Sequence, residues 1–358
     1  MAPDLLSGRE NDGYVFSMKA IVYSSTGGRD VLEFVDRPVP EPGPGEVRVR
    51  VVISGVNHSD WKAREFGHRG GPLMFPEVVP HHDGGGVVDA VGEGVDPGRV
   101  GQRVWVWEAA YKRPHGTAAE YTIVPSRNAV PLPANVSFEV GASLGLRAVV
   151  AHRCLLAGQH GPARLGPGAL EGCTVLVAGG AGGVGQAAIQ LGTWAGASVI
   201  ATVSSPEKAK LALAAGAAHT VDYRSATVVE DIRALAPGGV DLIVEVAATA
   251  NIGTAVEVIA TDGTVAAYGT EGTSELTFPT RKAIGRNLRF QFVMVMTMPA
   301  ADKDLAAADI TDAAAAGAIT AGEEAGLPLH RFPLRRTGDA QDAVQAGIVG
   351  KVLVDVGE

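Results

Sequence analysis

The first third of the chain alternates short apolar runs with breaks at glycine and proline. Residues 18–23 (MKAIVY) and 46–54 (EVRVRVVIS) are rich in β-branched residues, whereas PVPEPGPGE (38–46) between them suits neither a helix nor an inner strand. The same pattern continues in the apolar runs at 84–95, 101–107 and 117–125. We therefore expect a compact, mostly β domain of barrel-like shape.

The pattern changes near residue 145. Residues 173–222 predict a strand, a glycine-rich turn, a helix, a strand, a helix and a strand. Further strands are expected after helical stretches, at 239–247, 263–269 and 287–295. Such alternation is typical of a parallel, doubly wound sheet. An alanine-rich helix is expected at 303–317, and the tail at 350–356 (GKVLVDV) predicts a strand that returns to the first domain.

These patterns predict an α/β protein of two domains. Residues 145–295 would form the doubly wound domain, and residues 18–144 together with 296–358 would form the discontinuous, mostly β domain. Residues 1–17 precede the first predicted strand and are expected to be a mobile extension. A length of 358 residues with 46% hydrophobic content is sufficient for two packed cores.

The amino-acid composition limits the kinds of molecule that the protein could bind. The net charge is −9 and the chain has no run rich in Lys and Arg, which argues against nucleic acid. No apolar run has the roughly 18 residues of a membrane span, and the N-terminus lacks the pattern of a secretory signal. Cys154 and Cys173 form no CxxC pair, as is common in a reducing compartment. We expect a cytoplasmic protein that binds a small molecule.

The stretch VLVAGGAGGVG (175–185) places Gly180, Gly182 and Gly185 in the spacing G-x-G-x-x-G. The stretch follows an apolar strand and opens an amphipathic helix, and in that context the spacing indicates a dinucleotide site rather than a glycine-rich turn without a ligand. Gly180 would permit the tight turn, Gly182 the approach of a diphosphate, and Gly185 close packing of helix on sheet. The free N–H groups at the start of the helix would face the anion.

The next strand, SVIATVSS (198–205), bears on the choice of dinucleotide. An NAD site usually ends this strand with Asp or Glu, whereas this chain has Ser204 and Ser205, followed by Lys208. Hydroxyls and a cation suit a 2′-phosphate, so NADPH is favoured over NADH. Lys208 as an ordinary surface lysine is the alternative. Ser205 is also expected to cap the following helix, with Pro206 at its first position.

With both halves in view, the chain from Met18 to its C-terminus resembles the medium-chain dehydrogenases/reductases, and most of all the zeta-crystallin type of NADPH:quinone oxidoreductase. The motifs that carry this resemblance are GVNHSD (55–60), GGGVVDAVGEGV (84–95), GTAAEYTIVP (116–125), AGGAGGVGQAAIQL (178–191), VSSPEKA (203–209), VDYR (221–224) and NLRFQFVMV (287–295). The resemblance implies a Rossmann domain that binds NADPH and a GroES-like barrel domain that supplies the catalytic side of the site.

The resemblance also implies roles for individual residues. Four consecutive residues would line the diphosphate, namely Gly182, Gly183, Val184 and Gly185. Ser204 and Lys208 match the 2′-phosphate site, and Tyr223 would lie beside the adenosine phosphate. The remaining cofactor contacts, from the adenine to the carboxamide, would be Asn251, Gly269, Thr270, Phe292 and Val293. Asn57 and Asp60 fall at the catalytic position.

No metal site is expected. Zinc-dependent members of the superfamily have a cysteine ligand at the position of Asn57. His82 and Asp83 match the last two residues of the family's Gly-His-Glu motif, but the third ligand would fall in LGLRAVVAH (144–152), on a leucine or an arginine that cannot bind zinc. A zinc site assembled from His58, His82 and Asp83 is the alternative. Otherwise His82 would form hydrogen bonds in the cleft or be structural.

Without a metal ion as Lewis acid, the site would suit only some classes of hydride acceptor. Reduction of a ketone develops an alkoxide, whose pKa is close to that of bulk water, about 15.7. Reduction of a quinone develops a phenolate-like oxygen with a pKa of about 10, and an enone is intermediate. A site that offers an amide such as Asn57, a backbone N–H and water therefore suits a quinone or an enone. Asn57 would orient the cofactor or the acceptor, and solvent would supply the proton.

The function predicted from these residues is NADPH-dependent reduction of a quinone or similar conjugated carbonyl by hydride transfer without zinc. The alternatives are an alkenal or enone double-bond reductase of secondary metabolism and a non-catalytic NADPH-binding protein. The stretch FQFVMVMTM (290–298) is apolar and ends the predicted parallel sheet, with no Lys or Pro within it. A strand of this kind at a sheet edge favours pairing with a second chain, so a homodimer or a tetramer is expected.

Overall fold

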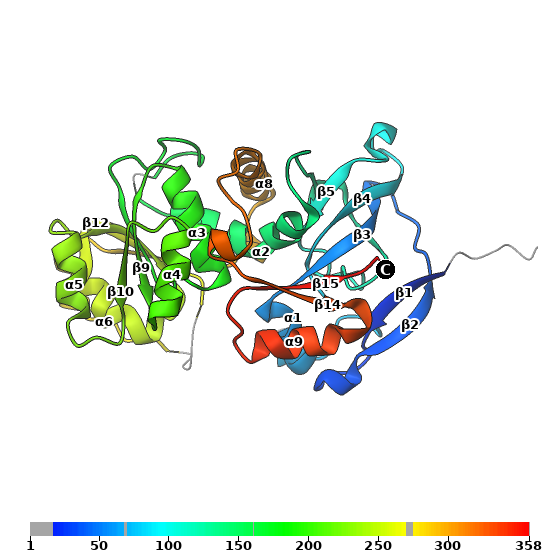
Figure 1. The fold of residues 1–358 in the computed structure, drawn as a ribbon, viewed down its shortest axis with the longest axis horizontal. Coiled ribbons are helices and arrows are strands. Elements are labelled where there is room, and N and C mark those ends of the chain that lie inside the picture. Colours follow the sequence, from blue (N-terminus) through cyan, green and yellow to red (C-terminus); the bar gives the residue numbers. More distant parts are fainter. Residues whose placement is uncertain (1–16, 68–69, 160, 270–274, 358) are drawn as a thin grey trace, which may run out of the picture.

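The computed structural model describes residues 17–67, 70–159, 161–269 and 275–357. Two β-sheets occupy the two ends of an elongated molecule, and the helices α2 and α8 lie between them (Figure 1). This arrangement confirms the predicted α/β class, with a doubly wound sheet and a separate, mostly β region.

The β-rich end contains a sheet of seven strands within the described residues, in the order β14-β15-β3-β4-β5-β7, with β6 paired to β3. Its strands are β3 (Glu46–Val56), β4 (Asp83–Val91), β5 (Arg103–Val106), β6 (Tyr121–Pro125), β7 (Ala129–Pro131), β14 (Leu329–Pro333) and β15 (Lys351–Asp355). The C-terminal strand β15 pairs antiparallel with β3, with Leu353 opposite Gly55. The tail therefore returns to the first domain, as predicted.

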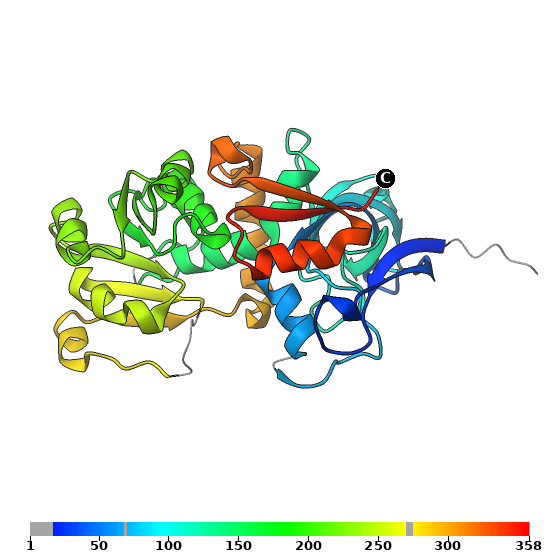
Figure 2. The same cartoon turned by 60° about the horizontal axis from the view of Figure 1, so that its bottom comes forward.

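A two-stranded pair lies beside this sheet, formed by β1 (Ser17–Val22) and β2 (Glu33–Pro38). Because Ser17 pairs with Pro38, the first strand starts at Ser17, one residue before its predicted start at Met18. Residues 1–16 lie outside the described residues. Figure 2, turned from the first view, shows α9 (Thr337–Gln345) running along β14 and β15.

The other end contains six strands of the described part, all parallel, in the order β10-β9-β8-β11-β12-β13. The strands are β8 (Thr174–Val177), β9 (Ser198–Val203), β10 (His219–Asp222), β11 (Val240–Glu245), β12 (Ile259–Ala267) and β13 (Arg289–Phe292). The last strand is shorter than predicted from 287–295. After Val293 donates its N–H to Ala267, the chain leaves the sheet for a 3-10 turn at Val295–Thr297.

Both faces of the parallel sheet are covered by helices. These helices are α3 (Gly183–Trp194), α4 (Pro206–Ala214), α5 (Val228–Leu235), α6 (Ala248–Val258) and α7 (Thr280–Gly285). Side chains of β8 alternate between two cores, because Val175 and Val177 pack with α3 and Leu176 packs with α5 and α6. This alternation is the burial pattern expected of an inner parallel strand.

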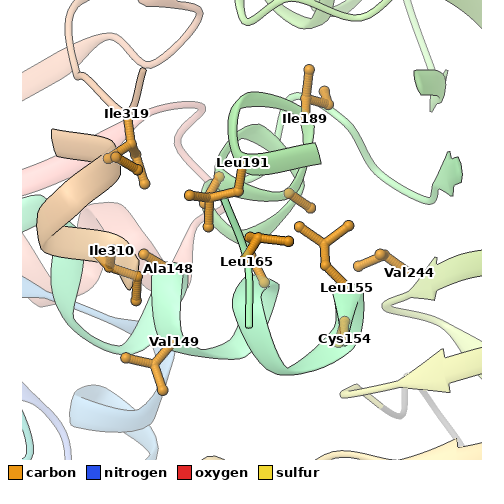
Figure 3. Packing of buried hydrophobic residues seen from close by; sticks show 14 of the residues in the cluster. Ala148, Val149, Cys154, Leu155, Leu165, Ile189, Leu191, Val244, Ile310 and Ile319 are labelled. Atoms are coloured by element: carbon orange, nitrogen blue, oxygen red, sulfur yellow. The ribbon is translucent and has the colours of Figure 1, made fainter. Parts of the chain in front are cut away.

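The two sheets are joined by a packed core rather than by a linker. In Figure 3, side chains of α2 (Phe138–Leu155), α3 and α8 (Ala300–Ala315) interdigitate, with Leu155, Ile189 and Ile310 among them. The same cluster includes the fully buried Trp105 of β5. Helix α8 packs on α2 at the centre of the molecule. The domain boundaries expected at residues 144 and 295 stay predictions.

Two further features bear on the expectations about location. Cys154 is buried and both cysteines are unpaired. Across the described residues, no helix combines the length and the apolar character that crossing a membrane requires. The expected cytoplasmic location stays a prediction.

Candidate cofactor and acceptor site

The glycine-rich turn follows β8 at the carboxyl edge of the parallel sheet. Gly179 has φ +68, so the left-handed residue of the tight turn is Gly179 and not Gly180, to which the sequence analysis had assigned it. A Cβ added to Gly180 would lie 2.7 Å from the Cβ of Ala201, and one on Gly185 would lie 2.3 Å from the carbonyl oxygen of Gly179. Glycine is therefore required at both positions. At Gly185 it allows the helix to pack closely on the turn.

The start of α3 offers free backbone donors. Gly182 is the N-cap residue and, like Gly183, lacks a side chain that could cap the helix. The first turn carries no acidic residue, and Val184 is only partly buried. Exposed N–H groups and the positive end of the helix dipole at this place form an anion site suited to a diphosphate.

The end of β9 is organised as the sequence predicted. The N–H of Lys208 donates to the hydroxyl of Ser205 (3.3 Å), so Ser205 caps α4 with Pro206 at its first position. The ammonium of Lys208 donates to the hydroxyl of Ser204 (3.1 Å). Glu207 is exposed. Ser204 and Lys208 therefore present a hydroxyl and a cation together beside the second strand, where a 2′-phosphate would lie.

A small cavity lies between strands of the parallel sheet and the helices α5 and α6. Its polar lining includes Tyr223, which is 49% exposed, Asn251 and the buried carboxylate of Glu245. Glu245 accepts hydrogen bonds from the N–H of Ala247 (2.6 Å) and from the side chain of Asn251 (2.9 Å), and its burial raises its pKa. The sequence analysis missed Glu245, although an acid at the end of an apolar strand is a visible signal.

The residues expected on the nicotinamide side follow β12 and β13. A Cβ on Gly269 would lie 2.3 Å from the carbonyl oxygen of Val246, so only glycine fits there. Thr270 lies outside the described residues. Val293 is buried and its N–H is engaged with Ala267 (2.8 Å), whereas Phe292 is 63% exposed at the sheet edge. The N–H of Val293 is therefore not available to a carboxamide.

Asn57 lies at the N-cap of α1 (His58–Phe66) and its side-chain amide is held on both sides. Its Nδ2 donates to Asp83 (2.8 Å), and its Oδ1 accepts from the ammonium of Lys351 (2.8 Å). Its backbone N–H donates to Asp60 (2.6 Å). The orientation of the amide is fixed by these partners, and one Nδ2 hydrogen is left over for a further acceptor.

Asp83 binds the helix α2 as well as Asn57. The helix is interrupted at Gly145, and the next N–H, of Leu146, donates to both carboxylate oxygens of Asp83 (3.1 Å each). A Cβ on Gly145 would lie 2.1 Å from the carboxylate carbon, so the kink requires glycine. Burial raises the pKa of Asp83, while Lys351 and Asn57 act in the opposite direction.

Lys351, the first residue of β15, is a buried ammonium that the sequence analysis did not single out. It is 4% exposed, donates to the carbonyl oxygen of Val56 (3.0 Å) and lies 3.7 Å from Asp83. Burial lowers its pKa and the charge of Asp83 raises it. A single lysine in the otherwise apolar GKVLVDV was the available signal.

Asp60 and His82 form the interior side of the cluster. Burial, helped by the charge of Asp83, raises the pKa of Asp60 to about 8, and burial lowers the pKa of His82 to about 4. The Nε2 of His82 lies 4.0 Å from Oδ1 of Asp60, and that oxygen has no hydrogen-bond partner among the described residues. At neutral pH His82 is therefore uncharged and Asp60 is mostly protonated.

Two other polar residues of α2 are also buried. Arg147 is 4% exposed and donates to Gln186, to the carbonyl oxygen of Ser143 and, at 3.4 Å, to that of Gly183. His152 lies 3.0 Å from the carboxylate of Asp309 inside the central core. His152 is thus a core histidine, as its place in an apolar helix predicted, with its Nε2 paired and its Nδ1 without a partner among the described residues.

A metal site was not expected from the sequence. Within the described ranges, no three or more His, Cys, Asp or Glu side chains are grouped closely enough to hold a metal ion. The side chain of Asn57 donates a hydrogen bond to Asp83 and accepts one from Lys351. These three residues therefore form a hydrogen-bonded cluster of polar and charged side chains.

A dinucleotide-binding parallel sheet joined to a GroES-like sheet defines the class of two-domain nicotinamide-dependent oxidoreductases. Family models match both parts: the alcohol dehydrogenase GroES-like domain matches residues 43–134, and the family described as zinc-binding dehydrogenase matches residues 183–309.

Similar proteins agree with this class. The rat quinone oxidoreductase is 30% identical over 261 residues, which cover 72% of this chain and 75% of the rat protein. The rat synaptic vesicle membrane protein VAT-1 homolog is 31% identical over 70% of this chain, but the match spans only 59% of that relative's length.

Among solved structures, a mycobacterial quinone oxidoreductase superimposes with a TM-score of 0.80 at 30% identity, over 94% of this chain and 99% of that one. A mycobacterial protein complexed with NADPH gives a TM-score of 0.77, also at 30% identity, over 94% and 99% of the two chains. The chain belongs to the quinone oxidoreductase family of the medium-chain dehydrogenases/reductases.

The raised pKa of Asp60 makes a prediction about stability. Its folded pKa of about 8 lies above its ordinary value of 3.8, so between these values the folded state binds more protons than the unfolded state. The contribution of Asp60 to the free energy of unfolding therefore falls as the pH rises. Urea unfolding from about pH 5 to pH 8 should show wild type losing up to a few kcal/mol more than Asp60→Asn. Parallel pH profiles of the two proteins would contradict this assignment.

Proposed function

We propose that this protein is an NADPH-dependent oxidoreductase that reduces a quinone or a similar conjugated carbonyl by hydride transfer without zinc. The observation that carries the proposal is the fixed amide of Asn57, held by Asp83 and Lys351 where zinc-dependent relatives have a cysteine. The similarity to quinone oxidoreductases and to a protein complexed with NADPH supports the same reaction and cofactor.

Each residue of the site would have a separate role. NADPH supplies a hydride from its nicotinamide C4 when bound. The start of α3 at Gly182 and Gly183 would bind the diphosphate, and Ser204 with Lys208 would bind the 2′-phosphate. The remaining Nδ2 hydrogen of Asn57 would donate to the acceptor oxygen, and solvent would supply the proton. Asp60 would act as a positioning residue, because it binds the backbone N–H of Asn57.

The hydrogen-bond donors of the site suit hydride acceptors whose reduction forms a stabilised anion. One neutral amide hydrogen bond is a modest stabiliser of an alkoxide, whose parent pKa is close to about 15.7. A hydroquinone anion needs far less help, because its parent pKa is about 10. A quinone is therefore the acceptor we favour, and an alkenal or enone is the second candidate. A non-catalytic NADPH-binding protein would bind NADPH tightly and turn over no acceptor.

A panel of acceptors tests the reaction. With NADPH and a chelator, we expect 1,4-benzoquinones to be reduced with a higher kcat/KM than enones, and simple ketones to be inactive. Asn57→Ala should lower kcat about 100-fold, since it removes a donor that acts on the developing charge. Steady-state absorbance of NADPH measures both results. Loss of activity in the chelator together with one zinc per chain in elemental analysis would refute the zinc-free reaction.

Cofactor choice gives a second test. NADPH should bind more tightly than NADH by about 1.5–3 kcal/mol, the scale of a charge-assisted hydrogen bond. Lys208→Ala should reduce this difference and leave NADH binding nearly unchanged, as measured by fluorescence titration. Lys210→Ala, an exposed lysine on the same helix, is the matched control and should keep the wild-type preference. Equal affinities of wild type for the two cofactors would rule out the 2′-phosphate site.

We also propose that the protein is a homodimer or a tetramer that pairs at β13. This strand forms one edge of the parallel sheet, and Phe292 and Met294 beside it are 63% and 61% exposed. An open edge with exposed apolar side chains favours pairing with the same edge of a second chain about a two-fold axis.

Light scattering at micromolar concentration tests the assembly. Phe292→Glu should convert the dimer to a monomer, because it buries a charge in the new interface while costing little in a chain where the residue is exposed. Leu213→Glu replaces another exposed apolar residue, 48% exposed on α4, and should leave the mass unchanged. A monomeric wild type with full activity would contradict the proposal.

A further inference from the structure

The charged side chains around Asn57 are buried, and among the described residues one of the cations forms no ion pair with either carboxylate. Two cations, Arg147 and Lys351, are each 4% exposed, and the carboxylates Asp60 and Asp83 are 3% and 0% exposed. These groups act on one another, since the charges of Asp83 and Arg147 both shift the pKa of Lys351. A buried charge is tolerated when an opposite charge compensates it. Each buried cation of the cluster therefore needs a group that compensates its charge.

Arg147 has no ion pair within the described part of the chain. Its hydrogen-bond acceptors are all neutral oxygens, on Ser143, Gly183 and Gln186. Its Nη2 is buried and has no hydrogen-bond partner among the described residues. Burial lowers the pKa of Arg147 to about 10, so the guanidinium stays charged at neutral pH. The charge of Asp83 raises the pKa of Arg147 against the effect of burial, but within the described residues no anion forms a hydrogen bond to the guanidinium. The orphaned Nη2 can therefore take an anion supplied from outside the chain.

The carboxylates of the cluster do not supply that anion. Asp83 is already shared by Asn57 (2.8 Å), the N–H of Leu146 (3.1 Å) and, at 3.7 Å, Lys351. Asp60 is mostly protonated at neutral pH, because its burial raises its pKa to about 8. Neither carboxylate forms an ion pair with Arg147 among the described residues, so the guanidinium has no hydrogen-bonded anion in this cluster.

The two cations contact the two parts of the candidate site, the glycine-rich turn and Asn57. Arg147 contacts the carbonyl oxygen of Gly183 (3.4 Å), at the start of the helix that follows the dinucleotide turn. Lys351 donates to the Oδ1 of Asn57 (2.8 Å), whose Nδ2 we assign to the acceptor oxygen. An acceptor that receives a hydride must lie between the cofactor and Asn57, and therefore near both charges.

We propose that Arg147 and Lys351 form a cationic pair that stabilises the negative charge left on the acceptor oxygen after hydride transfer. This inference rests on the proposed function and deepens it. In this step the C4–H bond of NADPH would break and NADPH would be oxidised to NADP⁺. The hydride would form a C–H bond at the β-carbon of an enone or an O–H bond at one oxygen of a quinone. The π electrons would shift to the conjugated carbonyl oxygen, which becomes the anion of an enol or a hydroquinone. Solvent then protonates that oxygen. Fixed charges in a water-poor site stabilise such an anion without reorganisation.

A phenol that does not react measures the charge of the pocket directly. With NADP⁺ bound, 4-nitrophenol should bind to wild type as its yellow phenolate, and its apparent pKa should fall by about one unit, a tenfold change in ionisation. Arg147→Met and Lys351→Met should each abolish most of this shift, whereas Arg147→Lys and Lys351→Arg should restore part of it. Absorbance titration against pH gives the bound ionised fraction.

Lys303→Met is the matched control. Lys303 is also a largely buried lysine, but it pairs with Glu108 (2.7 Å) away from Asn57, so its loss should leave the phenolate shift unchanged. Melting temperatures of all variants identify those that unfold. Arg147→Met is the decisive variant, because it leaves no carboxylate without a partner.

Kinetics separate this role from cofactor binding. Arg147→Met should lower kcat for a quinone about 10- to 100-fold and change the affinity for NADPH less than about threefold. A variant that binds NADPH poorly but keeps kcat would overturn the proposal, because Arg147 would then serve the cofactor.

The phenolate assay also separates this inference from the proposed function. Ionisation of bound 4-nitrophenol by wild type, with no acceptor reduced, would retain the electropositive pocket and refute the reductase. Active reduction of quinones with the same ionised fraction in wild type and Arg147→Met, or no binding of 4-nitrophenol at millimolar concentration, would refute the cationic pair.

Discussion

The carboxylate of Asp83 is the point on which the geometry of the site depends. It begins β4, and it binds Asn57 at the start of α1, the N–H of Leu146 in the kink of α2, and Lys351 at the start of β15. Four segments far apart in the sequence therefore meet at one buried charge. Removal of this carboxylate would leave Lys351 buried without its counter-ion, a change that is far more costly than loss of an exposed pair.

The kink at Gly145 links this cluster to the dinucleotide turn. The half of α2 before the kink packs against the β-rich sheet, and the half after it packs on α3 in the central core. Arg147 follows the kink by two residues and contacts Gly183 at the start of α3. The cluster around Asp83 and the glycine-rich turn are thus held by adjacent residues of a single helix, so their separation is defined by backbone geometry rather than by a flexible linker.

Much of the fold and half of the candidate site were predictable because their causes are local. The capping of α4 by Ser205 and the place of Lys208 beside Ser204 depend on residues four positions apart or fewer. Other assignments were wrong or absent. The tight turn belongs to Gly179 rather than Gly180, since backbone φ is not visible in a glycine pattern. The partners of Lys351 lie almost 300 positions away in the chain, and no local pattern reports them.

Local sequence patterns were enough to predict the two kinds of sheet, the glycine-rich turn between strand and helix, and the hydroxyls and lysine that replace an acid after the second strand. These features follow from periodicity and from residues adjacent in the chain. The packing of distant segments places Asn57 between Asp83 and Lys351 and buries Arg147 without an ion pair to any described residue. The physical reason is that burial and charge pairing depend on which distant segments share a low-dielectric interior, and sequence order does not specify that neighbourhood.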